Sequence, residues 1–142
     1  MQMNNRMRTA LVLLASLGAI PAYVWAHHST AMFDTAKLVT YHGTITKIVW
    51  ANPHCFIYFD GVLENAPAGA PVEHWAVEGQ SPSVMFNHGG WDEGTAKVGD
   101  KIILTGNPRR DGQPTMLLIT ATINGKTFQV MARQSVSISD KK

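Results

Sequence analysis

Residues 38–60, LVTYHGTITKIVWANPHCFIYFD, hold two strand-like runs on either side of a short break. Across 38–50, apolar side chains alternate with polar ones, and β-branched residues are frequent. A period of two is typical of a strand with one buried face. Here the pattern assigns that face to Val39, Tyr41, Ile45 and Val49. We therefore expect a first strand, with Gly43 as a bend or bulge.

The second run, 54–60, follows the break at Ala51-Asn52-Pro53 and is rich in aromatic residues. Alternation predicts a core-facing side made by Cys55, Ile57 and Phe59. The opposite side is predicted to carry His54, Phe56 and Tyr58. Cys55 is the single cysteine of the chain, so the fold cannot depend on an internal disulfide.

The later sequence predicts a third strand at 74–78, a helix of about two turns between Ser81-Pro82 and Gly89-Gly90, and strands at 101–106, 115–123 and 126–131. Three strands, a short helix and further strands form the element order of an oligonucleotide/oligosaccharide-binding (OB) type barrel. We expect an all-β domain with one short helix, folded as a small OB-like antiparallel β-barrel over 27–133, with a flexible tail at 134–142. An open antiparallel sheet or a small sandwich is the alternative. The predicted interior comprises Val39, Ile45, Val49, Cys55, Ile57, Phe59, Ile103, Leu117 and Ile119.

The first 26 residues have the pattern of a secretory signal peptide. Arg6 and Arg8 precede the apolar run 11–20, which is too short for a stable membrane span. Val24 and Ala26 occupy the −3 and −1 positions of a cleavage site, although cleavage after Ala22 is an alternative. We expect export to a bacterial periplasm, with secretion beyond the cell as the alternative. No later apolar stretch is long enough to span a membrane.

Charge argues against nucleic acid as a partner. The leader contains two of the twelve Lys and Arg residues and none of the ten acidic residues. The processed chain would therefore have equal numbers of acidic and basic side chains, whereas nucleic-acid binding needs a basic face.

Cleavage after Ala26 would make His27 the first residue and His28 the second. Such an end holds a free α-amine, two imidazoles and a backbone amide within a few bonds of one another. Nitrogen donors of this kind suit copper(II), so we expect a periplasmic copper-handling domain. Pro53 makes the Asn52-Pro53-His54 corner rigid, and His54 would complete the site from the rim of the barrel.

Other interpretations fit the same residues. His28 alone, with the amine and the intervening amide, could chelate Cu(II) or Ni(II) without help from the fold. Asn52 and His54 could instead satisfy backbone groups at the corner. A third interpretation is a metal-free ligand- or partner-binding barrel whose aromatic face stacks on a sugar or a hydrophobic ligand. That site would comprise Trp50, Asn52, Phe56 and Tyr58.

The sequence supplies little evidence for catalysis. Glu73 and Glu78 flank Trp75, but no carboxylate spacing indicates acid–base hydrolysis, and phosphate-loop and serine-nucleophile motifs are absent. We assign no catalytic residues and favour a binding protein over a copper oxidoreductase.

Several separated motifs carry a resemblance to a known family. They are His27-His28-Ser29, the tract 43–59 with Trp50-Ala51-Asn52-Pro53-His54 at its centre, Gly79-Gln80-Ser81-Pro82 before Gly90-Trp91, and Val98-Gly99-Asp100-Lys101 with Asp111-Gly112. The chain resembles a domain-of-unknown-function family of short exported bacterial proteins marked by an Asn-Pro-His motif. The resemblance implies export, one small β-rich domain and a role for Asn52, Pro53 and His54. It implies no established function.

Overall fold

The computed structural model describes residues 28–130. The predicted signal peptide, His27 and the predicted tail lie outside the described residues. The elements are α2 (His28–Ala31), β1 (Val39–Val49), β2 (Phe56–Leu63), β3 (Glu73–Glu78), α3 (Pro82–Gly89), β4 (Lys101–Pro108), β5 (Thr115–Ile123) and β6 (Lys126–Gln129). No helix within this part of the chain is long and apolar enough to cross a membrane.

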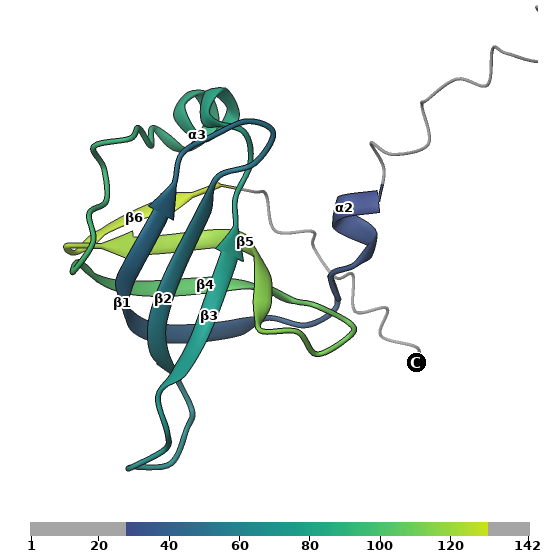
Figure 1. The fold of residues 1–142 in the computed structure, drawn as a ribbon, viewed down its shortest axis with the longest axis vertical. Coiled ribbons are helices and arrows are strands. Elements are labelled where there is room, and N and C mark those ends of the chain that lie inside the picture. The colour runs from purple at the N-terminus through teal and green to yellow at the C-terminus, as the bar shows by residue number, and fades with distance from the viewer. Residues whose placement is uncertain (1–27, 131–142) are drawn as a thin grey trace, which may run out of the picture.

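The strands form one sheet in the order β3-β2-β1-β4-β5-β6. All neighbours in that order pair antiparallel, and an additional parallel pairing between β3 and β5 closes β1 to β5 into a barrel (Figure 1). The helix α3 lies in sequence between β3 and β4. This order confirms the OB-like barrel predicted from the sequence.

The three side chains that alternation predicted for the core-facing side of the second strand all lie in the interior of the barrel. Cys55, Ile57 and Phe59 are all at most 5% exposed, whereas Tyr58 is 37% exposed. The predicted phase of this strand is therefore confirmed. The strand runs to Leu63, further than the expected end at Asp60, because β1 continues to pair with it there.

In β1 the predicted phase is wrong beyond Ile45. Ile45 pairs with Phe59 and Lys47 with Tyr58, so Thr46 is an extra residue on β1. A bulge of one residue exchanges the two faces of the strand that follows it. As a result Ile48, and not the predicted Val49, packs against the core cluster.

The predicted interior residues of β4 and β5 differ from the observed ones. Ile103 is 37% exposed, because its neighbours Ile102 and Leu104 occupy the inward positions. Leu117 and Ile119 are buried but lie outside the interior cluster. The register shifts between Thr105 and Gly106, and the inward residues of β5 change phase accordingly. They are Met116 and Leu118 before the shift and Ala121 and Ile123 after it.

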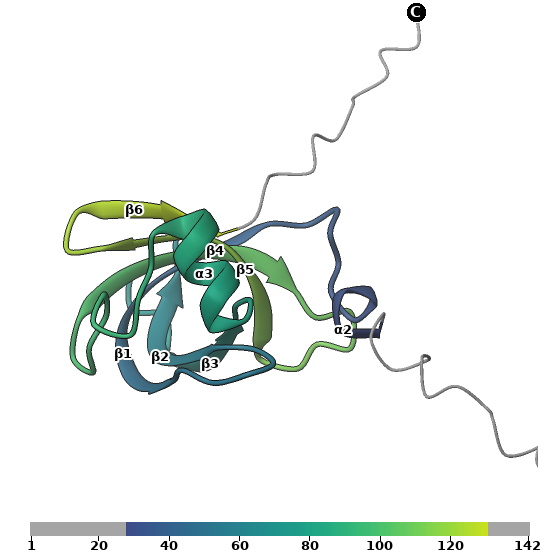
Figure 2. The same cartoon turned by 90° about the horizontal axis from the view of Figure 1, so that it is seen from above.

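The segment before β1 forms an arm that is fixed to the barrel beside the β4–β5 connection. Phe33 is fully buried and forms an isolated bridge with Arg109. The Asp34 amide donates to the Pro108 carbonyl at 2.8 Å, and the Asn107 side chain donates to the Lys37 carbonyl at 2.6 Å. These contacts hold α2, which begins at His28, outside the barrel beside this connection (Figure 2).

The helix α3 covers one end of the barrel (Figure 2). Met85 is its buried residue, and the chain leaves the helix through Gly90 in the left-handed conformation at φ 63°. The β1–β2 connection lies at the same end, so the Asn-Pro-His corner is next to this helix (Figure 1).

Candidate metal-binding site

His54 lies in the β1–β2 connection, two residues before β2 begins. The preceding Asn52–Pro53 peptide bond is cis. The backbone after His54 is fixed to the end of β3, because the Cys55 amide donates to the Gln80 carbonyl at 2.9 Å and the Gly79 amide donates to the Cys55 carbonyl at 2.8 Å. The His54 backbone is therefore held by the barrel and not by the loop alone.

The His54 side chain contacts a buried carboxylate. Its Nδ1 lies 2.5 Å from Glu78 Oε1, and the exposed fractions of the two side chains are 30% and 9%. This contact favours a proton on Nδ1, where it would face the carboxylate oxygen. In a neutral ring this leaves Nε2 with a free lone pair. The pair thus orients an imidazole whose other nitrogen can bind a metal ion.

Glu78 is held at the junction of three strands. It pairs with Phe56 on β2 and with Leu117 on β5, at the point where the parallel β3–β5 pairing closes the barrel. The Glu78 charge also acts on Arg109, the residue that forms the bridge to the arm. The same carboxylate therefore contacts His54 and contributes to the electrostatic environment of Arg109.

Arg109 itself is bound by Asp111 through two hydrogen bonds, the Nε bond measuring 2.9 Å. Hydrogen bonding to Asp111 is the main cause that raises the pKa of Arg109, and the charge of Glu78 adds a smaller contribution. The guanidinium lowers the pKa of Asp111 to about 2. The β4–β5 connection thus presents a fixed cation on the side of Glu78.

The structure separates the four residues of the predicted aromatic face. Phe56 and Tyr58 lie together on the outer face of β2, with ring centroids 6.5 Å apart. Trp50 is half-buried and packs against the core cluster, and Asn52 is exposed in the β1–β2 connection. Only Phe56 and Tyr58 therefore belong to one surface.

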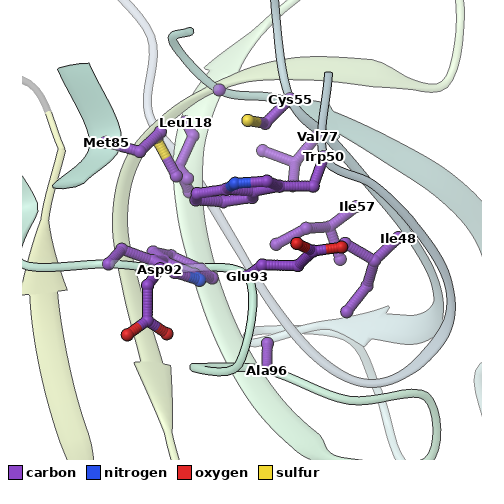
Figure 3. Close-up of a pocket in the computed structure, with 12 residues that line it drawn as sticks. Ile48, Trp50, Cys55, Ile57, Val77, Met85, Asp92, Glu93, Ala96 and Leu118 are labelled. Carbon is purple, nitrogen blue, oxygen red and sulfur yellow. The ribbon is translucent and has the colours of Figure 1, made fainter. Parts of the chain in front are cut away.

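Trp50 extends into a small cavity beneath α3 (Figure 3). The cavity volume is about 10 Å³, which is room for about one water molecule. Its walls include Cys55 and Met85, whose sulfur atoms lie around the Trp50 ring (Figure 3). Burial raises the pKa of the Cys55 thiol, which keeps it protonated and unreactive. The cavity is part of the core packing.

Two other histidines also contact carboxylates, but on the open surface. His74 Nδ1 lies 2.6 Å from Asp60 Oδ1, and His42 Nε2 lies 3.3 Å from Glu64 Oε1. His88 is exposed in the last turn of α3.

Within residues 28–130, no three or more His, Cys, Asp and Glu side chains are grouped so as to hold a metal ion. Of the predicted metal ligands, His28 begins α2 and His27 lies outside the described residues. The predicted convergence of His27 and His54 on one ion therefore stays a prediction.

Sequence reasoning missed Glu78 as the partner of His54. The missing information was the register of β2 on β3, since Phe56 faces Glu78 across the hairpin. Alternation does place His54 and Phe56 on the outer face of one strand and His74 and Glu78 on the outer face of the next. Assuming a hairpin between those two strands and testing its registers could have placed His54 next to Glu78.

Comparison with known proteins gives a family but no activity. No curated protein matches the chain. Residues 14–118 match the profile of a family of unknown function, DUF6152, and this match covers most of the chain. The chain therefore belongs to the DUF6152 family of unknown function.

Proposed function

We propose that the processed, exported chain binds copper(II) through the amino-terminal His27 and the His54 imidazole, with His28 as a further ligand. The α-amine and ring of His27 would supply two nitrogen donors, and His54 Nε2 a third. Copper(II) favours nitrogen donors in a tetragonal arrangement. The protein would act as a periplasmic metal-handling domain without chemistry of its own.

The observation that carries the proposal is the contact between His54 and Glu78. A histidine that binds a metal commonly donates its other ring N–H to a carboxylate, which fixes the orientation of the ring and makes it a better ligand. Here that contact measures 2.5 Å, and the carboxylate is buried. The exposed His74 makes a contact of similar length with Asp60, so the burial of Glu78 is what distinguishes His54.

The path of the arm supports a shared site. Phe33 is anchored next to Arg109, and the Arg109 guanidinium lies within the field of Glu78. Six residues lead back from Phe33 to His27, and an extended chain of that length reaches at most roughly 20 Å. The intervening helix α2 has four residues, too few for intrinsic stability, so binding energy could unwind it.

The decisive experiment requires an authentic amino terminus, because a tag or a retained methionine removes one ligand. The chain is exported, and mass spectrometry checks that it begins at His27. Cu(II) is then titrated and followed by calorimetry and electron paramagnetic resonance. His54→Ala should weaken binding more than tenfold, about 1.4 kcal/mol, and change the nitrogen hyperfine pattern.

Two variants make the result specific. His88→Ala removes an exposed histidine from α3 and should leave both affinity and spectrum unchanged. If His54→Ala binds copper like the parent while His28→Ala abolishes binding, the site is a local amino-terminal chelate. In that case the corner at Asn52-Pro53-His54 has a structural role only.

A second candidate function, a metal-free ligand-binding face, has one observation in its favour. Phe56 and Tyr58 stand side by side on the outside of β2, and Tyr58 is 37% exposed although it is a large aromatic residue. Trp50 and Asn52 do not belong to this face, so the candidate rests on the β2 aromatic pair alone.

A further inference from the structure

A hollow lies on the outer face of β2 and β3, where the β4–β5 connection passes beside them. Its volume is about 390 Å³, and Tyr58, Asp60, His74 and Gln113 line it. This volume is within the range of small-molecule sites, roughly 300 to 1,000 Å³. His54 and Glu78 take no part in it, so the hollow is separate from the proposed copper site.

Tyr58 gives the hollow a supported aromatic wall. The Phe56 ring lies 6.5 Å from the Tyr58 ring with a tilt of 30°, and Lys47 Nζ lies 5.3 Å from the Tyr58 ring centroid. Both contacts restrict the ring. An aromatic ring that is already held in place loses little conformational entropy when a ligand stacks on it.

The polar groups of the hollow lie on the neighbouring positions of the same two strands. Asp60 faces His74 across the β2–β3 pairing, and Asp60 Oδ1 is 2.6 Å from His74 Nδ1. The second oxygen of Asp60 is left to accept hydrogen bonds from a ligand. From the β4–β5 connection, Gln113 adds an amide that can both donate and accept.

The chemistry of this lining selects one class of ligand. Among the described residues, the walls contain a carboxylate but no lysine or arginine, and Lys47 lies outside them, over the Tyr58 ring. The wall carboxylate disfavours phosphates and other anions. The exposed Tyr58 ring next to hydrogen-bonding groups matches a molecule with an apolar face and hydroxyl groups at its rim.

We propose that this hollow binds the ring of a neutral sugar. The C–H face of the sugar stacks on Tyr58, and its hydroxyl groups bond to Asp60 and Gln113. This assignment gives a ligand class to the second candidate function and does not depend on copper.

The test is an array of neutral and acidic glycans, probed with the folded chain in the presence of EDTA so that copper plays no part. We expect binding to at least one neutral glycan, confirmed in solution by saturation-transfer NMR. Tyr58→Ala and Asp60→Asn should each weaken that binding at least tenfold. Phe86→Ala removes another exposed aromatic ring, on α3, and should not change it.

Three outcomes would overturn the assignment. They are the absence of any bound neutral glycan, binding to acidic glycans alone, and neutral-glycan binding that survives Tyr58→Ala. Binding of the hydrophobic dye Nile red tests separately whether the aromatic face binds any ligand at all. If the dye binds the parent but not Tyr58→Ala, and no glycan binds, the face takes hydrophobic ligands and the sugar assignment is wrong. Circular dichroism and urea midpoints check that each variant is folded.

Discussion

Two histidine–carboxylate pairs in this barrel have nearly the same length but different surroundings. His54–Glu78 measures 2.5 Å and His74–Asp60 measures 2.6 Å. The side chains of the first pair are 30% and 9% exposed, and those of the second 83% and 41%. Water competes for the second pair and screens its charges, whereas Glu78 has little solvent to replace a lost partner. Burial, more than distance, separates a fixed site from a surface contact.

The anchor of the amino-terminal arm gives the largest expected effect on stability. Phe33 is fully buried, so Phe33→Ala should cost about 3 to 5 kcal/mol of the free energy of unfolding. Urea denaturation measures this loss. Leu38→Ala, at an exposed position of the same arm, should change it by less than about 0.5 kcal/mol. Equal effects would mean that the arm is not part of the cooperative fold.

The two carboxylates can be compared directly by removing each one. Glu78→Ala leaves the Nδ1 donor of His54 without its partner at a half-buried position and should cost about 1 to 3 kcal/mol of unfolding free energy. Asp60→Ala opens an exposed pair and should cost less than about 1 kcal/mol. Both are measured by urea unfolding with the slopes compared. A larger loss for Asp60→Ala would contradict the role given to burial.

Copper affinity compares the same two carboxylates through substitutions that keep the shape of each side chain. Glu78→Gln keeps an oxygen that can accept from His54 Nδ1 but removes the charge. If His54 is a ligand, Cu(II) affinity of the processed chain should fall about 10- to 100-fold. Asp60→Asn is the matched change at the exposed pair and should leave the affinity unchanged. Calorimetric titration gives both values, and equal affinities for the parent and Glu78→Gln would remove Glu78 from the metal site.

Much of the barrel follows from local patterns in the sequence. Alternation gave the inward face of β2 correctly, and the helix begins after Ser81 at Pro82, as predicted. The bulge at Thr46 could not be predicted, because the sequence of β1 alternates equally well with or without an extra residue. In β5, the run Met116 to Ile119 is apolar throughout and has no readable phase.

The sequence indicated His54 as a candidate site residue but not its partner Glu78. The motif Asn52-Pro53-His54 drew attention to His54, because proline in a strand break indicates a rigid corner. Its role as a metal ligand stays a prediction. Its partner Glu78 follows in sequence by more than twenty residues and meets it only through the β2–β3 register. The arm contact at Phe33 and Arg109 is longer in range still. Local patterns predict strands, whereas these contacts depend on how the barrel closes.

The Arg109–Asp111 pair extends the comparison to a partly exposed ion pair, whose side chains are 24% and 51% exposed and where the smallest effect is expected. The folded-state pKa of Asp111 is lowered to about 2, below its ordinary value of 3.8, because Arg109 and the Gln113 amide bond the ionised form. A lowered folded pKa adds stability that is fully present above the unfolded pKa and is lost as the pH falls through the folded pKa.

We therefore expect the difference in unfolding free energy between the parent and Asp111→Asn to be constant above about pH 5 and to shrink between about pH 4 and pH 2. Urea unfolding at a series of pH values measures this difference, and added salt should reduce it because Asp111 is exposed to solvent. A difference that grows as the pH falls would have the wrong sign for a lowered pKa. It would mean that Asp111 is not held in its ionised form by Arg109, and the fixed cation beside Glu78 would lose its support.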